Sequence, residues 1–269
     1  MRDLFDVSGK VCLVTGGMGQ LGRQYSLAFA ERGARVVVLD QKIHQPDQER
    51  KFGALSKRML FLETDVTERS SLETALASIR ETWGEPEVLI NNAALDSPPG
   101  APAEENGPFE TYPVSSWEKV MNVNLKGVFL CCQVFGGAMA SAGKGSIINI
   151  SSIYGIVSPD QNIYEYRRKE GKTFFKPVAY SASKSGILNL TRYLATYWGK
   201  QRVRVNSVVL AGVFNNQDPE FLEAYCPKVP LGRMADETDY NGTMLFLASD
   251  ASSYMTGSTL VVDGGFTAW

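Results

Sequence analysis

Tyr180 and Lys184 are the pair of residues in this sequence best suited to proton transfer. They stand four positions apart, a spacing that puts both side chains on one face of a helix. Lowering a tyrosine pKa from about 10 to about 7 requires about 4 kcal/mol of preference for the phenolate. One ammonium about 4 Å away supplies roughly that much at an effective dielectric constant of about 20. We therefore expect Tyr180 to act as a general acid and base, although the pattern alone also fits a surface tyrosine and a solvated lysine.

A glycine-rich turn near the amino terminus is the second feature with chemical capacity. Gly17, Gly19 and Gly22 match the dinucleotide-binding fingerprint, in which glycines let the backbone approach a pyrophosphate at a helix amino terminus. The surrounding pattern predicts a buried strand, the glycine cluster, a helix and a second buried strand, over residues 11–15, 16–22, 23–32 and 35–40. This order is the βαβ unit of nucleotide-binding folds.

An acidic residue, Asp40, closes the second of these strands. A carboxylate at this place accepts hydrogen bonds from ribose hydroxyls and repels a 2′-phosphate. The sequence therefore favours NAD over NADP as the cofactor. The alternative is that Asp40 only caps a turn or a helix.

Short apolar runs continue to alternate with helical patterns along the chain. Further strands are expected at residues 59–63, 87–91, 146–150, 203–209 and 258–262, and helices at about 67–83, 114–142, 179–199 and 236–249. Strict alternation favours a parallel sheet with helices on both faces. We therefore predict an α/β fold, a single Rossmann domain over residues 1–269 with a doubly wound, seven-stranded parallel sheet.

Three long loops, at about 95–113, 156–177 and 211–230, are predicted to surround a substrate, because ligands of such sheets bind beyond the carboxyl ends of the strands. In the second loop, residues 164–176 carry five positive and two negative side chains. A basic, aromatic loop at this place is suited to an anionic substrate such as a phosphate, a carboxylate or a nucleotide sugar. Charges that merely keep the loop solvated are the alternative.

The composition excludes several classes of protein. Of 269 residues, 44% are hydrophobic and 21% are charged, as is typical of globular chains, and the net charge of −2 offers no basic field for nucleic acid. Four cysteines without metal-ligand spacing and a single histidine, His44, argue against a metal site and a Ser-His-Asp triad. No apolar run approaches a membrane span and the amino terminus is unlike a signal peptide, so we expect a cytoplasmic protein with reduced thiols.

Seven short motifs occur in a fixed order along the chain. They are Thr15-Gly16 to Gly22, Asp65-Val66, Asn91-Asn-Ala-Ala94, Asn124 in Val-Asn-Leu-Lys-Gly, Ser151-Ser152, Tyr180-x-x-x-Lys184 and Val262-Asp-Gly-Gly265. With these motifs the chain resembles the short-chain dehydrogenase/reductase family over nearly its whole length. The resemblance implies hydride transfer between a nicotinamide and a carbonyl or alcohol carbon.

The resemblance also implies a role for each catalytic candidate. Tyr180 exchanges a proton with the substrate oxygen, Lys184 lowers the Tyr180 pKa and holds the nicotinamide ribose, and Ser152 hydrogen-bonds the substrate oxygen. Ser151 is interpreted as a cap at the strand end. Asn124 anchors a water that relays protons to Lys184, unless it is a structural asparagine that distorts its helix.

Cofactor contacts are implied for the glycine turn and for the residues that follow the strands. Asp65 and Val66 are expected to frame the adenine, and Asn92 and Ala93 to lie near the ribose. The full set is Gly16, Met18, Gly19, Gln20, Leu21, Gly22, Asp40, Gln41, Asp65, Val66, Asn92, Ala93, Ala94, Val213 and Asn215, together with Tyr180 and Lys184.

The sequence departs from the family pattern in four places. Gln20 and Ala94 stand where glycine is usual, Leu210-Ala-Gly-Val213 replaces a Pro-Gly pair, and the segment from Ser152 to Tyr180 is long. The glycine spacing is similar to that of the extended branch, which acts on nucleotide sugars, whereas the length and the Val-Asp-Gly-Gly ending are similar to the classical branch. The basic insertion and Phe214-Asn-Asn-Gln217 are also similar to a bacterial subgroup in surface-sugar pathways, such as those for nonulosonic acids.

The function predicted from these features is NAD-dependent oxidation or reduction at a secondary alcohol or carbonyl carbon, with sugars and other polar, anionic molecules among the candidate substrates. One alternative is a nucleotide-sugar epimerase or dehydratase with tightly bound NAD. Another is a non-enzymatic NAD-binding sensor. The resemblance also implies a homotetramer or homodimer, formed through the helix that carries Tyr180 and through the last strand.

Overall fold

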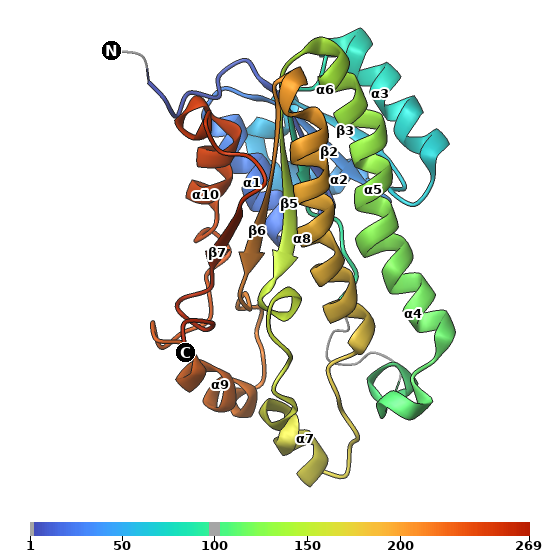
Figure 1. Cartoon of the computed structure of the whole chain (residues 1–269), viewed down its shortest axis with the longest axis vertical. Coiled ribbons are helices and arrows are strands. Elements are labelled where there is room, and N and C mark those ends of the chain that lie inside the picture. Colours follow the sequence, from blue (N-terminus) through green and yellow to red (C-terminus); the bar gives the residue numbers. More distant parts are fainter. Residues whose placement is uncertain (1–2, 97–102) are drawn as a thin grey trace.

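The computed structural model describes residues 3–96 and 103–269, so part of the predicted loop 95–113 lies outside the described residues. A single seven-stranded sheet forms the centre of the molecule, with all neighbouring strands parallel (Figure 1). The order across the sheet is β3-β2-β1-β4-β5-β6-β7. The strands are β1 (Val11–Thr15), β2 (Arg35–Asp40), β3 (Met59–Glu63), β4 (Val88–Asn91), β5 (Gly145–Ser152), β6 (Val203–Leu210) and β7 (Thr259–Val262). The predicted fold class and strand number are confirmed.

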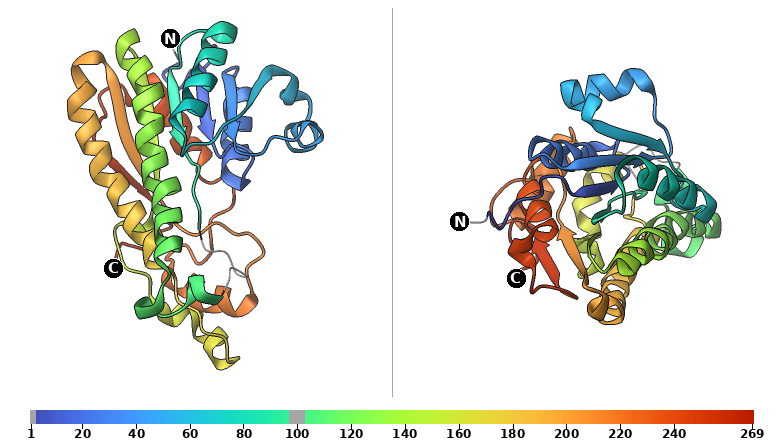
Figure 2. Two further views of the ribbon diagram at one scale, coloured as in Figure 1. Left: turned by 90° about the vertical axis from the view of Figure 1, so that its right-hand side faces the viewer. Right: turned by 90° about the horizontal axis from the view of Figure 1, so that it is seen from above.

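Helices connect the strands and cover both faces of the sheet (Figures 1 and 2). The α-helices are α1 (Gln20–Glu31), α2 (Gln45–Phe52), α3 (Arg69–Trp83), α4 (Val114–Met121), α5 (Val128–Cys131), α6 (Gly137–Ala142), α7 (Glu165–Lys169), α8 (Val178–Trp198), α9 (Pro219–Tyr225) and α10 (Asn241–Ala248). The π-helical stretches η4 (Asn122–Gly127) and η5 (Cys132–Gly136) join α4, α5 and α6 into one continuous helix over 114–142, as predicted.

Several boundaries differ from the sequence prediction. Strand β5 extends to Ser152, because its last residues remain in register with β6, where Ser152 pairs with Leu210. Helix α10 begins at Asn241, because Asp239 accepts a hydrogen bond from the Asp236 N–H and pairs with Arg233, which fixes a turn before the helix. Helices α2, α7 and α9 lie where no helix was expected.

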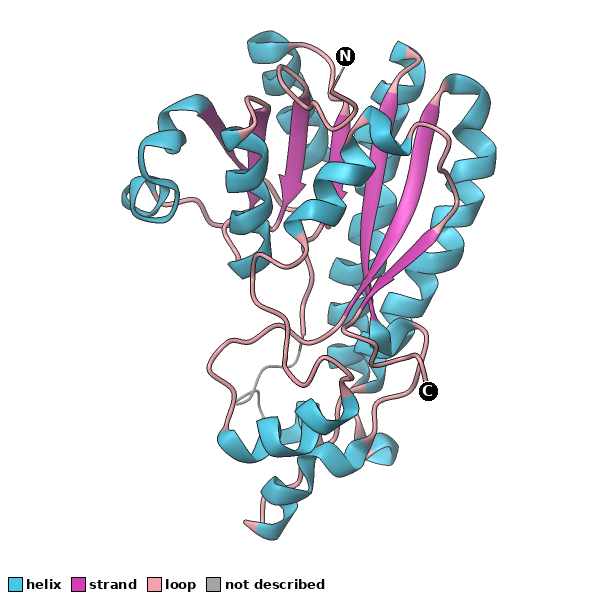
Figure 3. Cartoon of the chain, turned by 90° about the vertical axis from the view of Figure 1, so that its left-hand side faces the viewer, coloured by secondary structure: helices cyan, strands magenta, loops and turns pink. Residues whose placement is uncertain are grey.

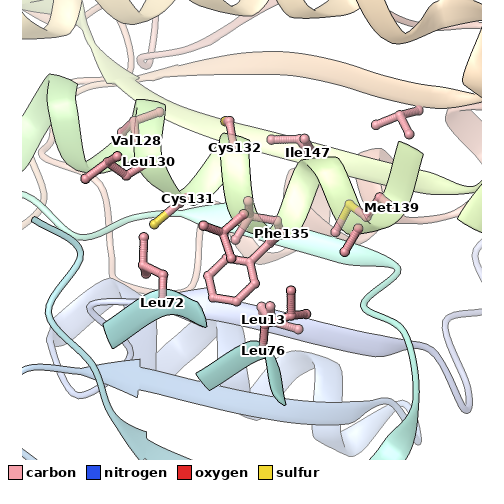
Figure 4. Packing of buried hydrophobic residues seen from close by; sticks show 14 of the residues in the cluster. Leu13, Leu72, Leu76, Val128, Leu130, Cys131, Cys132, Phe135, Met139 and Ile147 are labelled. Atoms are coloured by element: carbon pink, nitrogen blue, oxygen red, sulfur yellow. The ribbon is translucent and has the colours of Figure 1, made fainter. Parts of the chain in front are cut away.

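Alternate residues of each strand enter the two helical layers, as the pleat of a sheet requires. Leu13 of β1 packs with Leu72 of α3, Phe135 of η5 and Ile187 of α8 on one face. Figure 4 shows Phe135 pointing toward Leu13 and Leu72 at the centre of this layer. The other face packs against α1, α2 and α10, with Tyr25, Phe29, Phe52, Tyr240 and Met244 as its larger side chains.

The helix over 114–142 corrects the expectation that no apolar run approaches a membrane span. It contains an 18-residue window with a mean hydropathy of 1.4, which is long and apolar enough to cross a bilayer by composition alone. However, 56% of that window is buried inside the protein. Several apolar side chains of this helix, such as Val128 and Met139, belong to the core.

The carboxyl ends of the strands face a second group of short elements that lies beyond the sheet (Figure 3). Helices α7 and α9 and the start of α4 lie at this end (Figure 1). The sheet reverses its direction of growth between β1 and β4, which is where open α/β sheets form their ligand crevice. The fold therefore gathers the ends of β1, β4, β5 and β6 around one space.

Candidate active site

A cavity of about 990 Å³ lies at the carboxyl ends of the strands. It is bordered by most of the residues that the sequence singled out, although they come from the whole length of the chain. Those on its wall are Gly16, Gly19, Gln20, Leu21, Asp40, Gln41, Val66, Asn92, Ala93, Ala94, Ser152, Tyr180, Lys184, Val213 and Asn215. Met18, Gly22, Asp65 and Asn124 do not line the cavity and instead support residues that do.

The glycine turn is shaped to admit a ligand at the start of α1. Gly16 has a φ of +62°, which side chains disfavour. A Cβ on Gly22 would lie 2.2 Å from the Gly16 carbonyl oxygen, so the helix approaches the turn more closely than any other residue would allow. Gly19 is the N-cap, and no side chain in the described part of the chain caps this helix. Its first N–H groups and its dipole therefore suit a phosphate, and the turn fits a dinucleotide.

Asp40 lies at the cavity, as ribose recognition requires, and it also caps a turn, which was the alternative role. One carboxylate oxygen accepts a hydrogen bond of 3.0 Å from the Met18 N–H, which fastens the glycine turn to the end of β2. The other oxygen accepts a longer bond of 3.4 Å from the Lys42 N–H. Because Asp40 also borders the cavity, turn capping and ribose recognition are compatible.

Gln20 crosses from the glycine turn to the opposite side of the cavity. Its side-chain amide donates a hydrogen bond of 2.8 Å to the Phe214 carbonyl oxygen. The segment that it holds is also tied to Ala235, whose carbonyl accepts from the Phe214 N–H at 2.9 Å. A glycine at position 20 could not form this bridge, so the departure from the family pattern has a structural consequence.

Asn92 and Asp65 form hydrogen bonds that stabilise the turns in which they lie. The Asn92 amide donates to the carbonyl oxygens of Thr15 and Gly16 at 3.0 and 3.2 Å, joining the end of β4 to the glycine turn. Asp65 accepts from the Thr67 N–H at 2.8 Å before α3 begins. Burial alone would raise the pKa of Asp65, but hydrogen bonds from Thr67 and Gln41 bring it below the usual range.

Ser152 and Tyr180 meet at the floor of the cavity. The Ser152 hydroxyl accepts from the Tyr154 N–H at 3.2 Å and is near enough to the Tyr180 phenol to lower its pKa by hydrogen bonding. Ser151 has a different partner, because its hydroxyl donates 2.8 Å to the Lys184 carbonyl oxygen inside the core. Ser151 therefore supports α8 and Ser152 approaches Tyr180, although both serines border the cavity, and the catalytic role of Ser152 stays a prediction.

The expected effect of Lys184 on Tyr180 is wrong for this structure. Burial, followed by the negative charge of Asp96, raises the Tyr180 pKa above its usual value, and the hydrogen bond from Ser152 opposes the rise. The Lys184 Nζ donates 2.9 Å to the Ile150 carbonyl oxygen and lies 5.8 Å from the Tyr180 ring centroid. Desolvation therefore outweighs the attraction that the sequence argument assumed.

Lys184 itself is strongly affected by its surroundings. Its residue is only 3% exposed, and burial lowers its pKa from 10.5 to about 8, against the opposing attraction of Asp96. An ammonium with this pKa is protonated at neutral pH and becomes neutral under mildly alkaline conditions. It remains a hydrogen-bond donor in both states.

Asn124 lies buried in the π-helical stretch η4. Its side-chain carbonyl accepts from the Leu95 N–H at 2.7 Å, and its amide donates to the Leu95 carbonyl at 2.9 Å and to the Ser183 hydroxyl at 3.2 Å. These bonds occupy the side chain and hold Leu95, which borders the cavity. Asn124 therefore has a structural role as a buried residue that holds Leu95. Its role in a water relay stays a prediction.

The basic segment 164–176 does not form an open cationic surface. Its charges are largely paired, with Arg167 to Asp218 at 2.8 Å and Lys172 to Glu170 at 2.9 Å. Arg168 pairs with Glu165 at 2.6 Å and also donates to the backbone carbonyls of Phe174 and Gln161. The two arginines hold α7 and its loop together.

The sequence missed several side chains that shape the cavity on its substrate side. They are Asp96, Tyr154, Tyr164, Lys176, Phe221, Tyr225 and Met234. Lys176 precedes α8 by two residues and was noted only as one charge of the basic loop. The aromatic residues have no common spacing, because they come from two separate connections, one between β5 and α8 and one after β6, and no local signal identifies them.

Known proteins are similar to this chain over nearly its whole length. A family model described as "Enoyl-(Acyl carrier protein) reductase" matches residues 18–267. The chain is 30% identical to an NAD-dependent glycerol dehydrogenase of Listeria innocua, over 98% of this chain and 96% of that protein. It is 32% identical to a D-threitol dehydrogenase of Mycolicibacterium smegmatis, over 98% of this chain and 95% of that protein.

Solved structures give the same result. A short-chain dehydrogenase of Leptospira borgpetersenii with bound NAD+ superimposes with a TM-score of 0.85 and 33% identity, covering 99% of this chain and 96% of that chain. A gluconate 5-dehydrogenase of Burkholderia cenocepacia, solved with NADP and tartrate, gives a TM-score of 0.82 and 26% identity, covering 99% and 98%. None of the proteins named here is described as a surface-sugar enzyme, so the resemblance to that subgroup stays a prediction.

The lowered pKa of Lys184 can be tested through the pH dependence of the free energy of unfolding. Its folded pKa of about 8 is lower than the ordinary 10.5, so the unfolded chain binds more protons between these values and stability rises with pH across this window. Replacing Lys184 with Met removes that contribution. The stability of Lys184→Met relative to wild type, measured by urea unfolding, should fall by about 2 kcal/mol between about pH 7 and about pH 9.5.

Lys172→Met is the matched control, because its side chain is 68% exposed. Its stability difference from wild type should not vary over the same pH range. A Lys184→Met difference that is equally constant would contradict the lowered pKa of Lys184.

Proposed function

The chain belongs to the short-chain dehydrogenase/reductase family, and from that premise we propose that it oxidises a secondary alcohol of a small polyhydroxylated molecule with NAD. Its relatives act on alcohols, and they include a glycerol dehydrogenase and a D-threitol dehydrogenase. The observation that carries the proposal is the meeting of the Ser152 hydroxyl and the Tyr180 phenol on the cavity floor. Two hydroxyl groups directed at one point are suited to hold a single substrate oxygen.

Oxidation of the alcohol to a carbonyl removes a hydride from carbon and a proton from oxygen. A nicotinamide cofactor held by the glycine turn and Lys184 would supply the acceptor for this hydride. Tyr180 takes the proton as the phenolate, a form that its raised pKa disfavours until a bound ligand compensates for the charge. Ser152 donates a hydrogen bond to the same substrate oxygen and orients it. In the reverse direction the Tyr180 phenol returns the proton to the carbonyl oxygen.

We assign supporting roles to the other predicted residues. Lys184, fixed by its bond to the Ile150 carbonyl, holds the nicotinamide ribose, and Asn124 helps to anchor a proton-relaying water. The glycine turn binds the pyrophosphate, and Val66 and Gln41 lie on the adenosine side of the cavity. The loops 95–113, 156–177 and 211–230 form the substrate-binding part of a single cofactor-binding domain.

NAD is favoured because Asp40 places a carboxylate on the cavity wall near the glycine turn. Lys51, which reaches the glycine turn, donates 2.7 Å to the Met18 carbonyl and so supports the turn rather than an added phosphate. Structural neighbours divide on this point, since one was solved with NAD+ and another with NADP.

A homo-oligomer is proposed from an apolar surface on α4, α5 and α8. Its shallow hollow is formed by Trp117, Met121, Leu125, Phe129, Gly186 and Leu190. Phe129 is 44% exposed, and Tyr193 and Tyr197 beyond it on α8 are 64% and 63% exposed. An apolar surface of this kind favours a second copy of the chain. The strand β7 at the sheet edge is a second contact, which would make a tetramer.

Two aromatic residues near the carboxyl terminus differ in their packing. Phe266 stacks on Tyr225 of its own chain at 5.4 Å, whereas Trp269 is 81% exposed. A cytoplasmic location is also proposed, because all four cysteines are free thiols and three of them are buried.

Tyr180→Phe tests the chemistry. Loss of the proton acceptor should reduce kcat for glycerol, D-threitol or galactitol by at least about 100-fold, measured as NADH absorbance. NAD binding, followed by fluorescence titration, should change by less than about 3-fold. Tyr193→Phe, on the exposed side of the same helix, should behave as wild type. Undiminished turnover in Tyr180→Phe would refute the mechanism, and conversion of a sugar without net NADH would support an epimerase instead.

Asp40→Asn tests the cofactor. Asparagine keeps an acceptor for the Met18 N–H but removes the charge, so kcat/KM with NADP should rise relative to NAD by about 10-fold. Glu73→Gln, which removes an exposed carboxylate on α3, should leave the ratio unchanged. A ratio that Asp40→Asn does not alter would remove the argument for NAD.

Phe129→Asp tests the assembly. A charge within the apolar surface should convert the oligomer into smaller species in size-exclusion chromatography with light scattering. Tyr254→Asp, at a fully exposed residue away from this surface, is the control. An unchanged mass for Phe129→Asp, or a monomeric wild type, would be inconsistent with the proposed interface.

A further inference from the structure

Lys176 is a buried cation beside the proposed catalytic tyrosine. Its side chain is only 9% exposed, and its Nζ lies 4.8 Å from the centroid of the Tyr180 ring. It borders the same cavity as Ser152 and Tyr180. Neither the hydride transfer nor the proton transfer described above uses this ammonium. A buried charge is costly unless its partners compensate for it, so its place calls for an explanation.

The backbone of Lys176 is held in place by Gln161. The Lys176 N–H donates 2.9 Å to the Gln161 side-chain oxygen, and the Gln161 amide donates 3.3 Å to the Lys176 carbonyl. Two residues later α8 begins, so the stem of Lys176 is fixed between this clamp and the helix that carries Tyr180. The position of the ammonium is therefore preorganised before a substrate arrives.

The partner of Lys176 is Asp96, which lies in the loop after β4 and borders the cavity. The pair presents a cationic donor and an anionic acceptor side by side, with no net charge. A hydroxyl group matches both, because it accepts a hydrogen bond from the ammonium and donates one to the carboxylate. A substrate carboxylate would compete with Asp96 and be repelled by it.

The rest of the substrate wall is neutral. Burial raises the pKa of Tyr225 to about 12, and it also raises the pKa values of Tyr154 and Tyr164. These phenols therefore stay uncharged and supply apolar ring surface. The arginines of the basic loop are paired with Asp218 and Glu165, which offsets their positive charge.

Building on the proposed function, we propose that Lys176 and Asp96 together bind a hydroxyl group on the carbon next to the reacting carbon. The pair makes the site selective for vicinal diols, as in neutral polyols, over simple secondary alcohols and over hydroxy acids. A simple alcohol leaves the donor and acceptor without a substrate partner, and sites built to hydrogen-bond a hydroxyl discriminate strongly against analogues that lack it.

The test compares butane-2,3-diol with butan-2-ol, which differ by one hydroxyl group, and with 3-hydroxybutyrate as the carboxylate analogue. NADH formation is measured for wild type, Lys176→Met and Asp96→Asn. The ratio of kcat/KM for the diol to that for butan-2-ol should fall by about 10-fold or more in each variant, as expected for lost charged hydrogen bonds. Lys172→Met removes a solvent-exposed cation of the same loop and should keep the wild-type ratio.

The outcomes separate this inference from the function on which it rests. If wild type forms no NADH from any of the alcohols, including glycerol and D-threitol, the proposed function fails. If turnover is present but both variants keep the wild-type ratio, the inference is wrong and the function stands. A wild-type preference for 3-hydroxybutyrate that Lys176→Met abolishes would show that the site binds an anion and would equally overturn it. Should Lys176→Met fail to fold, Asp96→Asn decides, because the Asp96 side chain is 53% exposed.

Discussion

The geometry of the candidate site depends on how α8 is fastened to the end of β5. The Ser151 hydroxyl donates 2.8 Å to the Lys184 carbonyl, and the Lys184 Nζ donates 2.9 Å to the Ile150 carbonyl. All three residues are buried, so a shift of the helix by one residue would leave polar groups without partners in the core. These two bonds hold the helix that carries Tyr180 against the strand that carries Ser152, which keeps the two side chains within hydrogen-bonding reach.

The same burial that fixes Lys184 determines its electrostatics. The sequence argument treated Lys184 as a point charge near Tyr180 and predicted a lowered tyrosine pKa. In the folded chain, removal from water acts on both groups and disfavours each charged form, raising the Tyr180 pKa and lowering that of Lys184. Charge on one group is therefore favoured only when a ligand or a neighbour supplies compensation inside the cavity.

Sequence reasoning could locate the features that depend on neighbours along the chain. The glycine turn at Gly22 and the pair Tyr180 and Lys184 are defined by local spacing, and alternating apolar runs were enough to predict the sheet. It failed where contacts join distant segments: Asp96 and Lys176 meet only because two loops converge beyond the sheet. It also failed to predict α7, α9 and α2, whose few turns are stabilised by tertiary packing and ion pairs rather than by a clear apolar period.

Two departures from the family pattern act as ties between the segments that enclose the cavity. The Gln20 amide bridges 2.8 Å to the Phe214 carbonyl, and Arg167 of the long insertion pairs with Asp218 at 2.8 Å. Both ties end on the segment that begins after β6. An insertion that satisfies its arginines in this way can lengthen the chain between Ser152 and Tyr180 without loosening the substrate side. The insertion then acts on a substrate through the shape of the cavity wall and through Lys176. A general positive field would require the arginines to be unpaired.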